Sequence, residues 1–488
     1  MKIAAAPLPL ASEADEEIVR MHAVLSRQMA EFVADRNPGV AVRRDRLDRA
    51  IAVLSDNRQA WCEALAEDFS CRSREESSLI EMLIPLENLH YARKHLRAMM
   101  APERRATNFP FNILGGRSEI RFQPKGVVGN IVPWNIPILG LFGPLAAMLA
   151  AGNRVMVKMS EFAPVSGRLA QRLLAQAFRP DELAVFCGDG EVGAAFAALP
   201  FDHLMFTGST RVGKLVMRAA ADNLTPVTLE LGGKSPVVVC EDADLALTAR
   251  RIAWGKLVNG GQACIAPDYA LVPHRNLDDF VKAVSTAMLR QFPDPMQDPA
   301  LTGLINEAHL QRLQGYVDDA RRHGAQVIPI AAPNPSAPSV GRKLMPMLIV
   351  NPSEQCRVMQ EEIFGPILVV KSYETLDEAI RYINNRPHPL ALYCFGGPQA
   401  CARVIDNTCS GGIAVNDVIT HAMQENLPFG GIGHSGMGAF HADYGFRSFS
   451  HARSVYCGTR KDPLSKLRPP YGAAARNTLD FLLRLRRR

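Results

Sequence analysis

The chain has 488 residues, of which 47% are hydrophobic, so it is long enough for two or more domains with cores of their own and is not expected to be disordered. Its 55 Lys and Arg residues against 49 Asp and Glu residues give a net charge of +6, spread over a large surface. Nucleic-acid binding needs a concentrated basic face and is not expected. The ten cysteines include no C-x-x-C pair, so neither a zinc site nor a disulfide framework is indicated, and a reducing cytoplasm fits best.

The first part of the chain is expected to be helical, because residues 12–100 carry apolar side chains at helix spacing. The stretch before it, residues 3–11, is short, broken by proline and followed by acidic residues, which makes a poor signal peptide. Residues 117–123 and 126–132 are then expected to be strands. After them, β-rich and helical runs alternate: 154–158 before 166–178, 183–187 before 192–199, and 203–207 before 212–221. This alternation predicts βαβ units and a parallel sheet.

A second alternating stretch begins near Pro236 and continues through residues 269–272, 276–291, 310–323 and 367–395. Pro and Ser cluster at 331–339 and predict an exposed loop within this second domain. The longest apolar stretch, residues 136–152, is interrupted by prolines and glycines and falls short of the roughly 20 residues that a membrane helix needs. It predicts a buried helix, and no integral membrane segment is expected.

The C-terminal residues 482–488 are rich in Leu and Arg. They fit either a basic amphipathic turn that touches anionic lipid or a solvated tail. We favour the solvated tail.

Two glycine-rich turns compete as the phosphate site. Residues 188–193 fit G-x-G-x-x-G, but no acidic residue about 20 positions later is placed to hold a ribose, so we interpret them as a strand-to-helix turn. Residues 206–213 suit a pyrophosphate better, because a strand there ends in Gly208-Ser209-Thr210 and a helix begins. By itself, Ser209 fits an ordinary helix cap equally well. Upstream, Lys158 and Glu161 at a strand end suit ribose hydroxyls, although such a pair alone is more often a surface salt bridge.

Cys264 is the candidate nucleophile. It lies in Gly-Gly-Gln-Ala-Cys-Ile-Ala-Pro, residues 260–267, where the glycines free the backbone to present the thiol and its own N–H to a ligand. A single cysteine is more often an inert small apolar residue, so this interpretation needs support from elsewhere in the chain.

Three motifs supply that support: Glu230-Leu231-Gly232-Gly233-Lys234-Ser235-Pro236, Cys264 placed 34 residues after Glu230, and Glu361-Glu362-Ile363-Phe364-Gly365-Pro366. In order and spacing they resemble the aldehyde dehydrogenase superfamily. Pro133-Trp134-Asn135 and residues 158–161, 208–213 and 428–433 extend the resemblance over most of the chain. Met159 departs from it, because the family usually has proline there.

Finer similarities point to one branch of that superfamily. The residues around Cys264 and the segment 445–451 are similar to the shorter, class-3-like branch, which includes fatty and aromatic aldehyde enzymes. Within it, Ser435-Gly436-Met437-Gly438 followed by His441 is most similar to coniferyl aldehyde dehydrogenases.

The resemblance implies a catalytic role for three residues. Cys264 would attack the carbonyl carbon to form a thiohemiacetal, whose oxyanion would be held by the Asn135 amide and the Cys264 N–H. After hydride transfer to a nicotinamide, Glu230 would activate the water that hydrolyses the thioester, and it would also deprotonate the thiol.

The same resemblance implies NAD or NADP as the cofactor and no metal. Glu362 would hold the nicotinamide ribose with Phe364 nearby, Lys158 and Glu161 the adenosine ribose, and Ser209 the pyrophosphate. NAD is expected over NADP, because Glu161 would repel a 2′-phosphate. The remaining cofactor contacts are expected from Trp134, Gly208, Thr210, Gly213 and Leu231.

The implied fold is α/β: a doubly wound, Rossmann-type cofactor domain over residues 1–116 and 124–235 and an α/β catalytic domain over 236–425. A small β oligomerisation segment over 117–123 and 426–460 and a basic tail over 461–488 complete it. Because the family dimerises through such a segment, a homodimer or dimer-based oligomer is expected.

The expected substrate is an aromatic, coniferyl-type aldehyde, and medium- or long-chain aliphatic aldehydes stay open. Two other functions also stay open: a CoA-acylating semialdehyde dehydrogenase and a catalytically inactive structural relative. Retention of Glu230 argues against the first, and the intact set of Cys264, Glu230 and Asn135 argues against the second.

Overall fold

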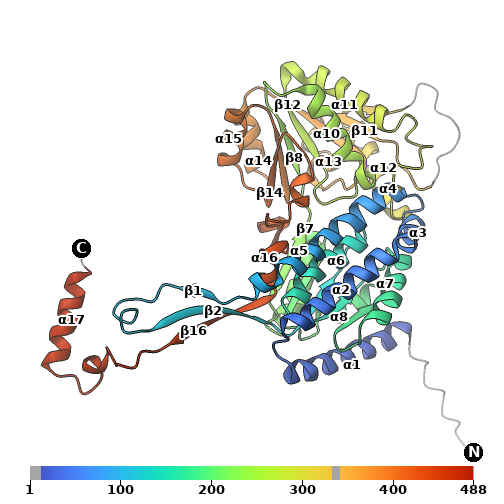
Figure 1. Cartoon of the computed structure of the whole chain (residues 1–488). Helices are drawn as coiled ribbons and strands as arrows, with labels where there is room; N and C mark the ends of the chain where they lie inside the picture. The colour runs from blue at the N-terminus through green and yellow to red at the C-terminus, as the bar shows by residue number, and fades with distance from the viewer. Residues whose placement is uncertain (1–11, 332–340, 487–488) are drawn as a thin grey trace, which may run out of the picture.

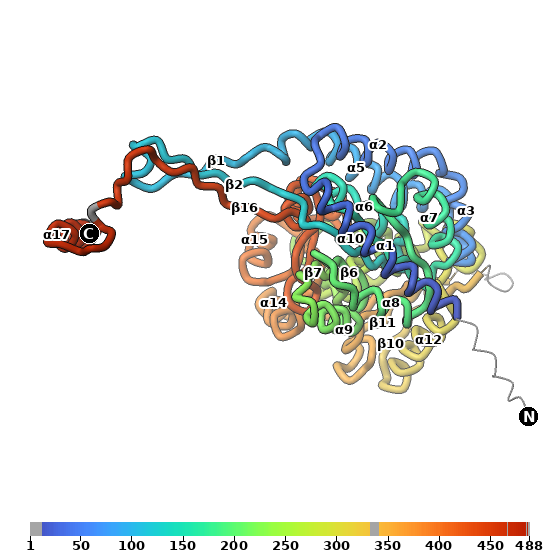
Figure 2. The backbone as a smooth tube through the Cα atoms, turned by 90° about the horizontal axis from the view of Figure 1, so that it is seen from below, coloured from blue at the N-terminus to red at the C-terminus, as the bar shows by residue number. Residues whose placement is uncertain are grey.

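The computed structural model describes residues 12–331 and 341–486, so the predictions for residues 3–11 and for the loop at 332–339 fall outside the described residues. Two lobes, each built around its own β-sheet, lie one above the other, and a narrow arm of three strands extends from them (Figure 1). The view from below shows the same arm reaching away from both lobes (Figure 2).

The N-terminal part is helical, as predicted. Its helices form because apolar residues recur at helix spacing, and Ser12 caps the first helix through a hydrogen bond from the Asp15 N–H to its hydroxyl. Leu47, Leu54 and Leu65 of this apolar stripe are fully buried. In chain order the elements are α1 (Glu13–Ala34), α2 (Val40–Asp56), α3 (Arg58–Asp68), α4 (Arg74–Ser77), the π-helix η1 (Ser78–Leu83) and α5 (Ile84–Met99).

The lower lobe contains a six-stranded sheet in the order β15-β7-β6-β3-β4-β5. The predicted parallel sheet is confirmed by β3 (Val127–Ile131), β4 (Arg154–Lys158), β5 (Leu183–Phe186), β6 (His203–Gly208) and β7 (Val227–Leu231); β15 (Gly436–Met437) adds an antiparallel edge. The intervening helices are α6 (Pro137–Ala150), α7 (Pro164–Ala177), α8 (Gly190–Ala197) and α9 (Thr210–Ala221). The prediction of a buried helix within residues 136–152 is confirmed, because nearly every residue of α6 is buried.

This strand order reverses at β3, since the chain continues to β4 on one side and to β6 on the other. In open α/β sheets, ligands bind at the carboxyl ends of the strands beside such a reversal. The residues that follow β3 and β6 include Asn135 and Ser209, respectively, so both lie at this edge.

The upper lobe contains a seven-stranded sheet whose strands are parallel except at one edge. In spatial order the strands are β10 (Gln326–Pro329), β11 (Met347–Val350), β12 (Ile367–Tyr373), β9 (Tyr269–Pro273), β8 (Pro236–Val239), β13 (Ala391–Phe395) and β14 (Gly412–Val415). Every residue of β8, β9 and β13 is buried, as expected for central strands covered on both faces.

Helices cover both faces of this sheet and connect its strands. They are α10 (Leu245–Leu257), α11 (Leu277–Gln291), α12 (Glu307–Arg322), α13 (Arg357–Gln360), α14 (Leu376–Asn384) and α15 (Pro398–Asn407), with the 3-10 turns η2 (Val258–Gly261), η3 (His274–Asn276) and η4 (Thr420–Met423). Within the alternating stretch predicted to run through 367–395, two strands, β12 and β13, have α14 between them.

The arm is an antiparallel sheet of β1 (Glu103–Arg105), β2 (Arg117–Pro124) and β16 (Ser450–Cys457). β2 corresponds to the predicted strand at 117–123. α16 (Ala442–Ser448) leads into β16, and beyond the arm lie the turn η6 (Ser465–Leu467) and α17 (Ala473–Leu485). The C-terminal segment therefore ends in a helix, most of whose described side chains are exposed.

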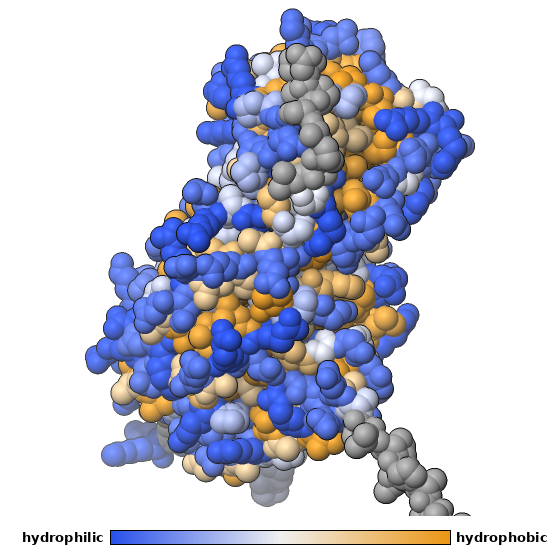
Figure 3. Space-filling model, turned by 90° about the vertical axis from the view of Figure 1, so that its right-hand side faces the viewer, coloured by the Kyte–Doolittle hydropathy of each residue, from blue (hydrophilic) through white to orange (hydrophobic). Residues whose placement is uncertain are grey.

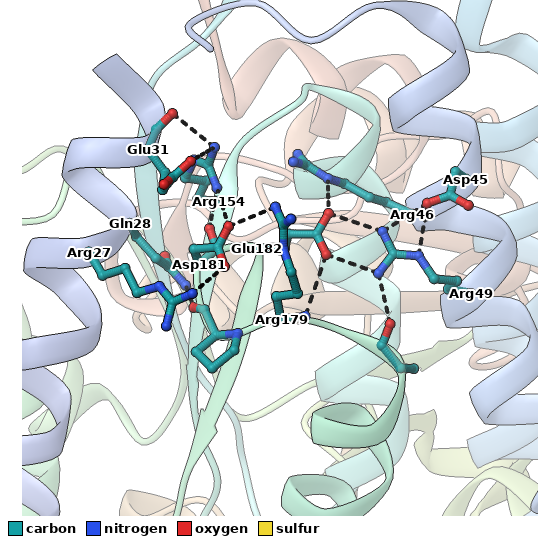
Figure 4. A network of polar contacts seen from close by, with 12 residues as sticks. Arg27, Gln28, Glu31, Asp45, Arg46, Arg49, Arg154, Arg179, Asp181 and Glu182 are labelled. Carbon is teal, nitrogen blue, oxygen red and sulfur yellow. Dashed lines mark hydrogen bonds and ion pairs between the residues drawn. The ribbon is translucent and has the colours of Figure 1, made fainter. Parts of the chain in front are cut away.

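A polar network fixes the first two helices to the lower sheet (Figure 4). Glu182, just before β5, pairs with Arg46 at 3.2 Å and with Arg49 at 3.1 Å, both from α2. Arg154 of β4 donates to the carbonyl oxygen of Asp181, and the Asp181 carboxylate pairs with Arg27 of α1 at 3.3 Å. Asp181 and Glu182 are buried but paired, which is the arrangement that makes a buried charge tolerable.

The surface carries hydrophilic and hydrophobic residues interspersed over the face drawn in Figure 3. Across residues 12–331 and 341–486, none of the helices combines the length and the apolar character needed to cross a membrane.

Candidate active site

The nucleophile loop follows α10 and has an unusual backbone. Asn259, Gly260 and Gly261 have positive φ angles of 52°, 60° and 77°. A Cβ on Gly260 would lie 2.6 Å from the Thr302 carbonyl oxygen, and one on Gly261 would overlap the Gly365 carbonyl. Both positions therefore require glycine, for conformation and for space. The turn ends the helical segment before Cys264, and the residue Cys264 is half-buried.

Asn135 lies against this loop, as the sequence predicted. Its side-chain Nδ2 donates to the Gln262 carbonyl at 3.0 Å, which leaves the second N–H of the amide available to a ligand oxygen. Asn259 Nδ2 donates to the carbonyls of Asn135 at 2.8 Å and Gln262 at 3.0 Å. The amide predicted to stabilise an oxyanion is thus tied to the loop that carries Cys264.

Glu230 is on β7 and is 2% exposed. Neither of its carboxyl oxygens has a hydrogen-bond partner among the described residues, and burial raises its pKa well above the usual value. Burial also raises the pKa of the Cys264 thiol to about 12, with further contributions from the carboxyls of Glu362 and Glu230. The structure therefore places both acids within electrostatic reach of the thiol.

Glu362 and Phe364 follow α13. Burial raises the pKa of Glu362 to about 8, and the Asp268 carboxylate adds to this shift. The Glu362 carboxyl lies directly against the backbone of Gly232, where a Cβ would overlap it. Phe364 has a φ of 52°, and its ring meets that of Trp134 edge-on at 5.3 Å.

Residues that carry no obvious motif support this segment. Asp268 accepts a hydrogen bond from the Ile363 N–H at 2.9 Å and pairs with Lys234. Arg312 of α12 donates to the carbonyls of Glu362 at 3.2 Å and Ile363 at 2.8 Å. Glu362 is therefore held at its backbone carbonyl by Arg312, and its carboxyl accepts from the Gly233 N–H.

The predicted phosphate turn has the expected form. Ser209 is the exposed N-cap of α9, and its hydroxyl accepts from the Val212 N–H at 3.3 Å. Thr210 Oγ1 donates to the His434 carbonyl at 3.1 Å. A Cβ on Gly213 would lie 2.6 Å from Leu231, so glycine allows α9 to pack closely on β7.

The competing turn at residues 188–193 is confirmed as a structural strand-to-helix turn. The Asp189 carboxylate caps α8 by accepting from the N–H groups of Glu191 at 3.0 Å and Val192 at 3.2 Å. An acidic cap occupies the amides that a phosphate would use and repels its charge.

Lys158 is more enclosed than the ribose role alone suggests. It is 2% exposed, and its Nζ donates to the carbonyls of Met159 and Gly188, both at 2.8 Å, while Glu161 is exposed. One Nζ hydrogen remains for a ligand. The Met159 N–H donates to the Phe186 carbonyl at 2.9 Å, a bond that proline could not make, so Met159 extends the pairing of β4 with β5.

Two acids from the N-terminal helices, the half-buried Glu76 and the buried Glu81, also shape the site and were not identified from the sequence. Glu76 accepts from the Asn259 N–H at 3.0 Å. Glu81 accepts from the N–H groups of Ile138 and Leu139 at the start of α6, directly after Asn135. Both lie more than fifty residues before the motifs they support, within a helical pattern that gives no sign of such a contact.

Comparison with known proteins identifies the class to which this arrangement belongs. The sequence model of the aldehyde dehydrogenase family matches residues 12–455. The chain therefore belongs to the aldehyde dehydrogenase family, whose members oxidise aldehydes with NAD(P)+, and it is an oxidoreductase of this class. The predicted family and α/β fold are confirmed.

Individual relatives agree with this assignment. A "Probable coniferyl aldehyde dehydrogenase" of Caulobacter vibrioides is 47% identical, over 97% of this chain and 98% of the relative. The "Coniferyl aldehyde dehydrogenase" of a Pseudomonas species is 45% identical, over 95% and 96%. Among solved structures, substrate-bound Staphylococcus aureus AldH superposes with a TM-score of 0.88 at 33% identity, over 95% of this chain and 99% of that one.

A more distant structure shows the cofactor class in a neighbour. The Pseudomonas syringae indole-3-acetaldehyde dehydrogenase AldA, in complex with NAD+, superposes with a TM-score of 0.81 at 25% identity, over 90% of this chain and 89% of that one.

Proposed function

We propose that this protein oxidises an aromatic aldehyde of the coniferyl type to the carboxylic acid, with Cys264, Glu230 and Asn135 as its catalytic residues. The observation that carries the chemistry is the convergence of the three side chains: Asn135 bonds to the Cys264 loop, and the Glu230 carboxyl acts on the pKa of the thiol. The substrate class is supported by relatives at 45–47% identity that are named for coniferyl aldehyde.

In the first half of the reaction, Cys264 Sγ attacks the aldehyde carbon and its proton passes to the Glu230 carboxylate. The carbonyl oxygen becomes an oxyanion that accepts hydrogen bonds from the Asn135 amide and the Cys264 N–H. NAD(P)+, when bound, would supply the hydride acceptor for the two-electron oxidation of the thiohemiacetal carbon to the thioester level.

In the second half, the thioester must be hydrolysed. Glu230, which has first released the thiol proton to solvent, takes a proton from a water molecule, whose oxygen attacks the thioester carbon. The carbon–sulfur bond then breaks, Cys264 leaves as a thiolate and takes back the proton held by Glu230, and the carboxylic acid is released. The absence of hydrogen-bond partners for both Glu230 oxygens among the described residues leaves them available to this water.

The residues at the carboxyl edge of the lower sheet fit a dinucleotide. The exposed N-terminus of α9 with Ser209 suits the pyrophosphate, and the Trp134–Phe364 pair with Glu362 suits the nicotinamide end. The remaining Lys158 hydrogen and the exposed Glu161 suit the adenosine ribose. The turn between β6 and α9 is shaped by Gly208, Thr210, Gly213 and Leu231.

NAD+ is proposed as the preferred cofactor, because Glu161 would repel the 2′-phosphate of NADP+. The ratio of kcat/KM for NAD+ over NADP+ tests this, with Glu161→Gln as the comparison. The ratio should fall in the variant, because the repulsion is removed while the size of the side chain is kept. An unchanged ratio would show that Glu161 does not discriminate.

The arm is proposed to join two copies of the chain in a homodimer. It exposes large apolar side chains far from either lobe, with Phe109 and Ile113 each 69% exposed and Tyr456 52% exposed. Such a surface is typical of one that is covered by a partner. Light scattering on the full chain should give twice the monomer mass of 53.4 kDa or a multiple of that dimer mass. A monomer at micromolar concentration would contradict it.

A panel of aldehydes tests the proposed substrate. Steady-state kcat/KM should be higher for coniferyl aldehyde than for acetaldehyde or succinic semialdehyde, and the product should be the free acid without added CoA. The reverse ranking would overturn the substrate class. A requirement for CoA would instead indicate an acylating enzyme.

A further inference from the structure

Three side chains with metal-binding atoms meet where the end of α12 packs against the start of α13. We call them the α12–α13 cluster: Asp319, His323 and Cys356. Asp319 is on α12, His323 is its C-cap, and Cys356 is the N-cap of α13. One carboxylate oxygen, one imidazole nitrogen and the thiol sulfur all lie within 4.8 Å of one another. None of the three residues belongs to the catalytic or cofactor-binding set, so the cluster is available for another role.

The fold itself brings these donor atoms together. Asp319 and His323 are four residues apart, which places them on the same face of α12. The His323 Nδ1–H donates to the Asp319 carbonyl oxygen at 2.9 Å, and this bond holds the ring 3.7 Å from the Asp319 carboxylate. The other carboxylate oxygen accepts from the Arg357 N–H at 2.8 Å, which fixes the first turn of α13 beside α12. Cys356 directly precedes that N–H, so its thiol is held close to the carboxylate.

The charge state of the cluster suits a cation. The hydrogen bond from the Arg357 N–H holds the pKa of Asp319 below its usual value, so this carboxylate is ionised near neutral pH. Burial, and then the Asp319 carboxylate, raise the pKa of the Cys356 thiol, which keeps its proton until a metal ion displaces it. Arg322 is the competing cation, 3.5 Å from Asp319 Oδ1. Its side chain is 70% exposed and is free to turn into solvent.

The kinds of donor atom select the metal. Calcium and magnesium prefer oxygen ligands alone, whereas sulfur, imidazole nitrogen and carboxylate oxygen together are a set that zinc accepts. In a tetrahedral zinc site the ligand atoms are about 3.3–3.8 Å apart, so the cluster must close by about 1 Å. Rotation of the exposed His323 side chain supplies that movement, and the same exposed side admits the ion and a water molecule. Cys356 is fully buried, so the thiol forms the inner wall of the site.

We propose that the α12–α13 cluster binds one Zn²⁺ ion through Cys356, His323 and Asp319, with water as the fourth ligand. The sulfur–hydrogen bond of Cys356 breaks, a sulfur–zinc bond forms, and the proton passes to solvent, without any change in oxidation state. The ion would join the start of α13 to the end of α12. This inference goes beyond the proposed function and does not depend on it. The spacing of the cysteines gave no sign of the site, because only one of its ligands is a cysteine.

Co²⁺ is the probe for this site, because it replaces zinc and its absorption spectrum reports its ligands. The metal-free full-length chain should bind one Co²⁺ with the d–d bands of a four-coordinate ion and a sulfur-to-cobalt charge-transfer band. Added Zn²⁺ should remove both. Cys264→Ser should retain the charge-transfer band, because the active-site thiol is not a ligand. A band that is absent from the wild type, or that disappears in Cys264→Ser, would overturn the proposal.

The thiol ligand is tested by Cys356→Ser, which keeps the size of the side chain. It should lose the charge-transfer band and bind Zn²⁺ at least about tenfold more weakly, since the loss of even an outer partner of a metal ligand costs that much. Cys62→Ser makes the same change at another buried thiol and should alter neither property. Equal zinc affinity in the wild type and Cys356→Ser would contradict the assignment.

A second variant keeps the test decisive if Cys356→Ser does not fold. His323→Gln changes an exposed side chain and should weaken Zn²⁺ binding at least about tenfold while the sulfur-to-cobalt band remains at saturating Co²⁺. Zn²⁺ should also raise the thermal midpoint of the wild type more than that of His323→Gln, because an ion that binds only the folded chain stabilises it. His22→Gln, at an exposed position of α1, should behave as the wild type. Equal affinities and equal midpoint shifts in the wild type and His323→Gln would overturn the proposal.

Discussion

Glu81 offers a severe test of how the N-terminal helices support the active site. Its side chain and that of Arg72 are fully buried and form an ion pair of 2.7 Å. The other carboxyl oxygen accepts from the N–H groups of Ile138 at 3.0 Å and Leu139 at 2.8 Å. In Glu81→Gln the amide has a single acceptor oxygen, so it cannot serve both Arg72 and the start of α6. Either the buried Arg72 guanidinium or the buried N–H groups at the start of α6 are then left without an acceptor.

The size of the effect follows from that loss. Removing one partner of a buried ion pair costs about 3–5 kcal/mol. At about 2–4 °C per kcal/mol for a folding unit of roughly 150–250 residues, the thermal midpoint should fall by roughly 6–20 °C. Circular dichroism at a fixed scan rate measures it. The double variant Arg72→Met/Glu81→Gln removes the unpaired charge while the amide oxygen still accepts from the start of α6, so it should recover most of the loss.

The same substitution should affect catalysis, because α6 begins directly after Asn135. At a temperature where the variant is folded, kcat should fall, since the oxyanion donor loses part of its support. A midpoint within about 2 °C of the wild type would refute the reasoning, given the cost expected for an unpaired buried charge. So would a double variant that is less stable than Glu81→Gln.

Three further substitutions test the chemistry. Cys264→Ser should abolish aldehyde oxidation while cofactor binding, measured by fluorescence titration, remains, because a hydroxyl is a far weaker nucleophile than a thiolate; turnover near the wild-type rate would remove Cys264 from the mechanism. Glu230→Gln should give a burst of NADH followed by a slow steady phase in stopped flow, because the amide cannot take a proton from water; equal loss of both phases would place the base elsewhere. Gly261→Ala should lower kcat/KM at least about tenfold, because a positive φ and an overlap with the Gly365 carbonyl both oppose the new Cβ. Gly324→Ala has a similar φ of 74° with nothing within 4 Å, and should leave activity unchanged.

Much of the fold could be predicted, because its signals are local. The alternation of β-rich and helical runs located β4 to β6 and α7 to α9, since each run carries its own periodicity. The turn at Ser209 was recognisable because a capping hydroxyl and two glycines are required within a few residues. The apolar run of α6 was assigned to a buried helix from its length and its prolines, and that is where it lies.

Elements without local periodicity were not predicted. β10, β11 and β14 have four residues each, and β15 has two, which is too short for a pattern to stand out. β15 joins the lower sheet from a segment far along the chain, where it pairs with Glu230 and Leu229. β1 is short and polar, and it joins the arm only through its pairing with β2. Such pairings depend on tertiary structure, which a single sequence window does not contain.

The candidate site divides in the same way. Motifs pointed to Cys264, Glu230 and Asn135 because each chemical step needs its own residue type. Asn259 was not singled out as a residue that holds Asn135, because its hydrogen bond joins positions 124 residues apart. The hydrogen bonds of Lys158 to two carbonyls could not be predicted from the sequence either, because a lysine near a carboxylate suggests an exposed salt bridge.

The raised pKa of Glu230 predicts how the rate of thioester hydrolysis depends on pH. Glu230 is buried without a partner among the described residues, so its pKa is raised well above the usual value and its neutral form is favoured. Only the ionised form can take a proton from water, so the steady-state rate of thioester hydrolysis should increase with pH from the ordinary carboxyl range, near 4.5, up to the raised pKa. In Glu230→Gln this rise should disappear from the steady phase. A wild-type steady phase that is already maximal at about pH 5 would mean that Glu230 ionises like an ordinary carboxyl or that another group activates the water. Burial would then not control the ionisation of Glu230 through its pKa. The unpaired carboxyl oxygens would no longer account for the deacylation step.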